Sequence, residues 1–267
     1  MPEYKAPLRD VRFVLYDLLD IEKHYARFPQ SADLTRDLID PILDEAAKVA
    51  EKIVAPVNRS GDEEGCHHEG DAVRTPKGFK EAYDKYYAAG LGGLEFAEEH
   101  GGQGLPASLG ILISEMMAGA NNSFSMYPGL TKGALAAIEA HGTPWAKTTF
   151  MPKMVSGQWS GTMCLTESHA GTDLGMLRTK AVPAPDGTFR ITGEKIFISA
   201  GEHDLTENIV HLVLARLPDA PPGTKGISLF IVPKFLPKPD GSVGARNGVK
   251  CASIEHKMGI KASATCV

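Results

Sequence analysis

Apolar residues recur every three or four positions through most of the first 157 residues of this 267-residue chain. The longest such stretch runs from Leu34 to Ile53, and its spacing predicts an amphipathic helix. Pro41 lies inside this stretch, so the helix either kinks there or begins again with Asp40 as its cap. The same spacing predicts helices over residues 107–120, 132–141 and 144–155. Thr75 and Pro76 are typical of a helix N-cap and first position, which predicts one more helix that ends near Gly90.

After Gly157 the pattern changes to short runs of β-branched and apolar residues that alternate with turn residues. Such runs predict strands, here over residues 159–165, 188–192, 195–199, 209–215, 227–232 and 249–254. Pro233 would end the fifth of them, because proline cannot donate to a strand ladder. The sequence therefore predicts an α+β protein with an N-terminal all-helical domain over residues 1–157 and a small β-barrel or β-sandwich domain over residues 158–267. Residues 262–267 resemble the start of another strand, so we expect the chain to be a fragment of a longer protein.

Composition narrows the class of protein. The chain is 43% hydrophobic and 23% charged, with a net charge of −5 and no long run of Lys or Arg, which argues against a nucleic-acid partner. The four cysteines are scattered without a C-x-x-C pair, which favours a reducing cytoplasm over a disulfide scaffold. No apolar stretch is long enough to span a bilayer and the first residues lack a signal-peptide pattern, so we expect a cytoplasmic protein without a membrane partner. Residues 66–69 (CHHE) resemble a metal site in composition, but they lack distant ligands, so we expect a polar loop and no metal.

Two segments carry candidate chemistry. MCLTESHAGTDLG (163–175) begins as an apolar strand and becomes a polar, glycine-bearing turn. Backbone amides at such a turn can hold an anion such as a pyrophosphate, although a plain polar turn has the same pattern. GEKIFISAG (193–201) places Phe197 two residues before Ser199, and in a strand both side chains would project to one side. An aromatic face and a hydroxyl together could meet a flat ring.

These segments make the sequence recognisable, because it resembles the acyl-CoA dehydrogenase family. MCLTESHAGTDLG is similar to the family's T-E-P-x-A-G-[ST]-D flavin loop, and GEKIFISAG is similar to its G-x-K-x-[WF]-I-[ST]-x-G strand. GGLEFAEEHGGQGLP (92–106) resembles the glycine-rich segment of its helical domain, and HKMGIKASAT (256–265) the end of its β domain. The start of the chain and residues 198–236 resemble the subgroup that includes 3-methylmercaptopropionyl-CoA dehydrogenase.

The resemblance implies an FAD-dependent acyl-CoA dehydrogenase that acts on 3-methylmercaptopropionyl-CoA or another short acyl-CoA. It implies hydride transfer to flavin N5, an electron-transferring flavoprotein as electron acceptor, and a homodimer or homotetramer. The residues that it implies for the flavin are Met163, Leu165, Thr166, Gly171, Thr172, Phe197 and Ser199. Those suggested for the acyl chain are Met126, Tyr127 and Leu130, with a role in the protein core as an equal alternative.

Three questions stay open on the sequence. The catalytic base of the family is usually a glutamate of a C-terminal domain, so none is named here, and we expect Glu167 to have a structural role. An acyl-CoA oxidase or flavin monooxygenase on the same fold would share the motifs. A catalytically silent fragment or a non-enzymatic scaffold that kept only these two domains would also share them.

Overall fold

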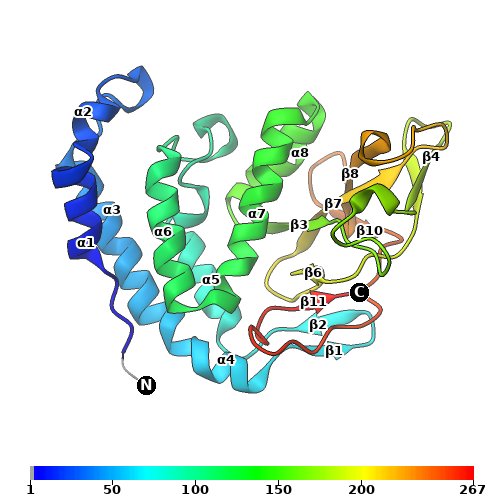
Figure 1. The fold of residues 1–267 in the computed structure, drawn as a ribbon, viewed down its shortest axis with the longest axis horizontal. Helices are drawn as coiled ribbons and strands as arrows, with labels where there is room; N and C mark the ends of the chain where they lie inside the picture. The colour runs from blue at the N-terminus through cyan, green and yellow to red at the C-terminus, as the bar shows by residue number, and fades with distance from the viewer. Residues whose placement is uncertain (1–2) are drawn as a thin grey trace.

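The computed structural model describes residues 3–267 and places helices before strands, which confirms the predicted α+β order (Figure 1). The helices are α1 (Leu8–Arg12), α2 (Ile21–Tyr25), α3 (Arg36–Val49), α4 (Asn58–Glu64), α5 (Phe79–Ala88), α6 (Ala107–Ala120), α7 (Asn122–His141) and α8 (Pro144–Val155). The strands are β1 (His67–Glu69), β2 (Ala72–Arg74), β3 (Trp159–Cys164), β4 (Lys180–Pro183), β5 (Phe189–Thr192), β6 (Ile198–Ser199), β7 (Asn208–Arg216), β8 (Ile227–Pro233), β9 (Phe235–Pro237), β10 (Val243–Arg246) and β11 (Thr265–Cys266). Short π-helical turns continue α1 and α3.

The predicted helices differ from the observed ones mainly at their first residues. α6 and α8 have the predicted bounds, and α3 continues through Pro41. α7 begins at Asn122 rather than at residue 132, because the Asn121 side chain accepts a hydrogen bond from the Phe124 amide and caps the helix. The prediction that Thr75 caps a helix is wrong, since α5 begins at Phe79 and the Thr75 hydroxyl and amide both donate to Asp204.

The main sheet is built around β7. β3 lies parallel to β7 from Trp159 opposite Asn208 to Cys164 opposite Val213, and β8 lies antiparallel along its other edge. β4 and β5 form a hairpin that meets only the end of β7. The strand predicted over 195–199 is reduced to β6, because Phe197 has a left-handed backbone. The strand predicted over 249–254 is wrong, since the segment forms a single β-bridge, between Ile254 and Cys266.

The N-terminal part is not all helical. β1 and β2 form a hairpin around a turn at Gly70, whose φ is 65°, where the sequence predicted a polar loop. Val73 of this hairpin packs in one cluster with Cys251 and Cys266, and the His68 ring nitrogen Nε2 lies 3.1 Å from the Cys251 carbonyl oxygen. The hairpin therefore joins the helical part to the β part, as Figure 1 also shows for β1, β2 and β11.

A second contact between the two parts is a shared apolar core. Trp159 of β3 and Val210 of β7 pack against α7 and α8, with Phe150 and Met154 among the fully buried neighbours. β3 can approach α7 closely because Gly161 has no side chain: a Cβ there would lie 2.6 Å from that of Ala134. The helices thus hold β3 in place, and one edge of β3 provides the site described next.

Candidate functional site

The outer edge of β3 has no strand partner among residues 3–267, while its other edge pairs with β7. The Gly161 amide donates to the Thr131 hydroxyl, and the Leu165 carbonyl accepts from the Lys195 ammonium, so both groups point away from β7. Because backbone groups alternate in direction along a strand, those of Met163 point the same way. Unpaired strand edges can bind partners through their N–H and C=O groups, so this edge is a candidate binding surface.

Thr166, Gly171 and Thr172 lie beside the end of this strand. The Thr166 carbonyl accepts a 2.9 Å hydrogen bond from the Ile196 amide, which holds the loop against the segment that leads to β6. Gly171 and Thr172 are exposed, and a Cβ on Gly171 would lie 3.7 Å from Thr166 Cγ2. The structure therefore brings the predicted loop residues together next to the β3 edge.

Phe197 and Ser199 border the same surface, but not as a strand pair. Phe197 precedes β6 and has φ 59°, which corrects the prediction that both side chains project from one regular strand. A left-handed backbone costs a non-glycine residue about 1–2 kcal/mol, and such strain clusters at ligand sites. The Phe197 ring is nevertheless 50% exposed, with the Lys257 ammonium 5.4 Å from its centroid. A strained backbone at Phe197 therefore accompanies an aromatic side chain that is exposed to solvent.

Glu167 holds the loop of residues 163–175 through buried hydrogen bonds, and only 4% of the residue is exposed. One carboxylate oxygen accepts from the Thr179 amide, the Thr179 hydroxyl and the Lys195 ammonium, and the other accepts from the Arg178 amide at 2.7 Å. Burial raises its pKa, but the hydrogen bonds from Lys195, Thr179 and Arg178 outweigh this and lower the pKa to about 2. Glu167 is therefore ionised at neutral pH, which supports the structural role expected from the sequence.

The residues suggested for an acyl chain lie on α7, and one of them belongs to the core. Tyr127 is fully buried; its hydroxyl donates to the Ala262 carbonyl at 3.0 Å and accepts from the Ala264 amide at 3.2 Å. It ties α7 to the segment before β11, which favours the alternative of a role in the protein core. Met126 and Leu130 are half-buried on the same helix.

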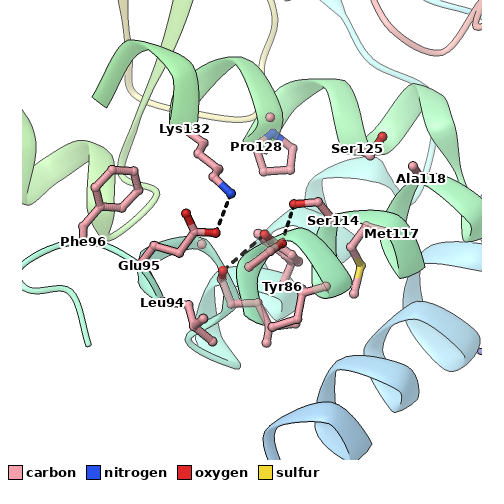
Figure 2. A pocket seen from close by; sticks show the side chains of 15 residues that line it. Tyr86, Leu94, Glu95, Phe96, Ser114, Met117, Ala118, Ser125, Pro128 and Lys132 are labelled. Atoms are coloured by element: carbon pink, nitrogen blue, oxygen red, sulfur yellow. Dashed lines mark hydrogen bonds and ion pairs between the residues drawn. The ribbon is translucent and has the colours of Figure 1, made fainter. Parts of the chain in front are cut away.

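A cavity of about 190 Å³ lies within the helical part, between α5, the turn that follows it, α6 and α7 (Figure 2). Its wall is mainly apolar, but it also contains five side chains with polar groups that the sequence reasoning missed, namely Tyr86, Glu95, Ser114, Ser125 and Lys132. Met126, Tyr127 and Leu130 do not line it. The missed signal was the placement of Ser125 and Lys132 seven residues apart on one face of α7.

Two buried histidines lie beside β3, away from its free edge. The Leu205 amide donates to His203 Nδ1, so Nε2 carries the ring hydrogen and donates to Ser160 Oγ at 3.0 Å. His211 Nδ1 lies 2.8 Å from Thr162 Oγ1. Burial, together with the Lys234 charge, lowers the pKa of His203 to about 3 and that of His211 to about 4. Both rings are therefore neutral and serve as structural hydrogen-bonding groups.

The remaining expectations concern metals and membranes. Over residues 3–267, no group of three or more His, Cys, Asp or Glu residues is arranged to hold a metal ion. Within the same range, no helix has the length and apolar character needed to cross a membrane. Cys164 of β3 is buried, and burial raises the pKa of its thiol to about 11.

Comparison with known proteins gives this site its context. The N-terminal domain model of acyl-CoA dehydrogenases matches residues 40–158 and the middle domain model matches residues 162–267. The chain belongs to the acyl-CoA dehydrogenase family, as the motifs predicted.

Among individual relatives, 3-methylmercaptopropionyl-CoA dehydrogenase from Ruegeria pomeroyi is 43% identical over 99% of this chain and 45% of its own length. The structure of butyryl-CoA dehydrogenase from Megasphaera elsdenii superposes with a TM-score of 0.69 at 28% identity, over 88% of this chain and 55% of that one. An acyl-CoA dehydrogenase from Bacillus anthracis, solved in complex with FAD, has a TM-score of 0.67 at 25% identity, over 88% of this chain and 35% of that one. The chain thus spans a little under half the length of the curated relatives that it matches.

Proposed function

We propose that this chain forms the helical part (residues 1–157) and the flavin-binding β part (residues 158–267) of an FAD-dependent acyl-CoA dehydrogenase. The proposed reaction is α,β-dehydrogenation of a short acyl-CoA thioester, with butyryl-CoA and 3-methylmercaptopropionyl-CoA as first candidates. Family membership and the FAD complex of a relative support the proposal. The observation that carries it is the open surface along β3, where a free backbone edge, an exposed aromatic ring and a polar loop adjoin.

The residues on this surface fit a flavin. The outward-facing backbone groups of Met163 and Leu165, with the Thr166 hydroxyl, offer donors and acceptors to the edge of a planar ring. Phe197 offers an aromatic face next to it, and Ser199 a hydroxyl. Gly171 and Thr172 leave room for a phosphate-bearing chain, because glycine allows close approach to the backbone. Bound FAD would supply hydride acceptance at N5, while these side chains bind, orient and shield it.

Glu167 is not the base in this proposal. A general base works best with a pKa near the operating pH and within reach of the substrate proton. Glu167 has a pKa of about 2, and both its oxygens already accept hydrogen bonds. The base is therefore a different residue, and Glu167 contributes by fixing the loop.

The proposal extends to partners and setting. Electrons would leave through an electron-transferring flavoprotein, and the protein would form a homodimer or homotetramer, as the family resemblance implies. The four thiols are free within the described chain, which supports the reducing cytoplasm expected from composition. Sedimentation of the purified protein tests the oligomer. Reduction of the partner flavoprotein during turnover, rather than rapid peroxide formation, tests the electron acceptor.

The decisive experiment is the visible absorption spectrum of the chain after incubation with FAD and desalting. We expect this chain to retain a flavin absorption band. In a protein that also contains the catalytic base, butyryl-CoA or 3-methylmercaptopropionyl-CoA should bleach this band. Gly171→Val places a branched side chain on the proposed surface and should reduce FAD retention at least tenfold. Gly248→Val is the matched control, because Gly248 is also exposed and a Cβ there has no neighbour within 4 Å. A colourless wild-type chain, or equal loss in both variants, would contradict the proposed site.

A further inference from the structure

A loop of residues 256–264 lies beside the candidate flavin surface. The Glu255 amide donates to the Thr265 carbonyl at 2.7 Å, which closes this loop at its base. Thr265 belongs to β11 and pairs with Ser199 of β6, and Figure 1 shows these two strands side by side. The loop therefore begins and ends next to β6, which directly follows Phe197.

The second half of this loop is held by hydrogen bonds from other parts of the chain. The Lys261 amide donates to Asp62 of α4 at 3.1 Å, and the Lys261 carbonyl accepts from the Cys66 amide at 3.0 Å. The Tyr127 hydroxyl of α7 donates to the carbonyl of the residue that follows Lys261. Because this half is fixed at several points, residues 256–260 at the free end of the loop have a defined place.

The free end joins the fixed half through a strained residue. Ile260 has φ 52°, which is an outlier for a β-branched side chain. Among residues 3–267, four residues other than glycine have a positive φ, and three of them, Phe197, Ala200 and Ile260, lie in this loop or in the segment beside it. Backbone strain persists where the surroundings fix it and clusters at ligand sites. The strain therefore marks the loop as part of the same surface as Phe197.

The loop places Lys257 against the exposed aromatic ring of this surface. The Lys257 ammonium lies 5.4 Å from the centroid of the Phe197 ring, within the range of a cation–π contact. Lys195 and Lys234 are half-buried like Lys257, and each of them is paired with a buried glutamate. Lys257 has no such carboxylate partner among the residues that the structure describes. Enclosed charges are usually paired, so this free one is available to a ligand.

We propose that Lys257 is a flavin-tuning residue, whose positive charge favours the forms of the bound ring that carry a negative charge. The inference rests on the proposed function, in which Phe197 adjoins the flavin ring. A hydride brings two electrons and one proton to N5, so a neutral oxidised ring becomes an anion. A cation beside the ring stabilises this anion and has little effect on the neutral ring, and nearby charge is one of the ways in which a protein adjusts a flavin.

Sulfite is a suitable probe of this charge. Its sulfur lone pair adds to N5 of oxidised flavin and leaves a negative charge on the ring, without any other reactant. The dissociation constant of sulfite is measured by the loss of flavin absorption in the FAD-loaded chain. Lys257→Met should weaken sulfite binding by about fivefold or more, while FAD retention should change by less than about threefold. Lys257→Arg keeps both the charge and the aromatic contact, so it should restore sulfite affinity to within about twofold.

Lys238→Met is the matched control, because it removes the same charge from an exposed position in the turn between β9 and β10. That turn approaches α8 instead, since a Cβ on Gly241 would lie 3.8 Å from Lys153 Cε. The control should leave sulfite affinity unchanged. Unchanged sulfite affinity in Lys257→Met, an equal loss in the control, or no recovery in Lys257→Arg would overturn the inference. Weaker FAD retention with unchanged sulfite affinity would also overturn it, because the charge would then act on the phosphates of FAD.

A measurement without flavin tests the contact itself. In the FAD-free chain we expect a nuclear Overhauser effect between the Lys257 side-chain methylene protons and the Phe197 ring protons, and its absence would overturn the placement of Lys257. A chain that does not retain FAD refutes the proposed function and this inference with it. A chain that retains FAD but keeps its sulfite affinity in Lys257→Met refutes the inference alone and leaves the proposed function standing.

Discussion

Replacing Glu167 with Gln tests whether this residue anchors the candidate flavin loop. The groups that form hydrogen bonds with its carboxylate are donors, namely the amides of Arg178 and Thr179, the Thr179 hydroxyl and the Lys195 ammonium. The His169 ring nitrogen Nε2 also lies 3.5 Å from one carboxylate oxygen. Glutamine replaces one acceptor oxygen by an NH₂ group, so at least one donor would face another donor. It also leaves the largely buried Lys195 ammonium without its counter-charge.

The magnitude follows from the pKa of Glu167. Its ordinary value is 4.5 and its value in the fold is about 2, and each pKa unit corresponds to 1.36 kcal/mol. The ionised form therefore contributes about 3 kcal/mol to the free energy of unfolding at neutral pH. Whole domains are stable by about 5–15 kcal/mol, so a loss of this size is readily measured.

The pH dependence gives an independent check. A carboxyl group whose pKa is lowered in the folded state binds protons more weakly there than in the unfolded state. Its contribution is fully present above pH 4.5 and is lost as the pH falls towards 2. The difference in stability between the wild type and Glu167→Gln should thus be about 3 kcal/mol at pH 7 and should shrink below pH 4.5.

Urea unfolding followed by circular dichroism measures both quantities. Glu194→Gln is the control, because Glu194 lies in the same segment as Lys195 but is exposed. A loss below about 1 kcal/mol at pH 7, a loss equal to that of the control, or a difference that stays constant between pH 7 and pH 3 would refute the reasoning.

Three further predictions concern other parts of the chain. Gly110→Ala should lower the free energy of unfolding, measured in urea, by about 2 kcal/mol, because the new Cβ would displace the Glu95 carboxylate. Alanine is otherwise the better helix former, so a gain in stability would show that Glu95 does not restrict this position. Phe197→Asn should change stability by less than about 1 kcal/mol, since relief of left-handed strain offsets lost burial, but should lower FAD retention in the absorption assay. Wild-type stability should fall as the pH drops from 6.5 towards 4, because neutral buried His203 and His211 take up protons on unfolding, and replacing either with Gln should flatten this limb of the unfolding curve.

The elements that local signals determine could be predicted from the sequence. α6 and α8 matched because Pro106 and Thr143 mark their starts and helical spacing fills the rest. The start of α7 was missed although Asn121 is a strong N-cap, because the polar residues after it hid the helical spacing. The strand predicted over 249–254 has β-branched residues, but only one β-bridge forms there, because a strand depends on its partner and β11 has only two residues.

The sequence indicates which residues to consider for the candidate site, but it does not indicate their geometry. Phenylalanine is a poor choice for a left-handed backbone, so no sequence signal announces the conformation of Phe197. The Glu95–Lys132 pair joins residues that are 37 positions apart, and its dependence on Gly110 is visible only in three dimensions. The family resemblance suggests Tyr127 for an acyl pocket, whereas in the fold its hydroxyl is hydrogen-bonded to backbone groups in the core.

Phe197, with its strained backbone, and the buried Glu167 are linked through the residues between them in the fold. The Lys195 ammonium donates both to Glu167 and to the Leu165 carbonyl, and the Ile196 amide donates to the adjacent loop, so the chain is held at the two residues before Phe197. Strained backbone conformations persist only where their surroundings fix them from several sides. Glu167→Gln should therefore lower FAD retention as well as stability, although Glu167 itself is buried away from the surface. A variant that lost stability but kept the flavin would mean that Phe197 keeps its conformation without this anchor.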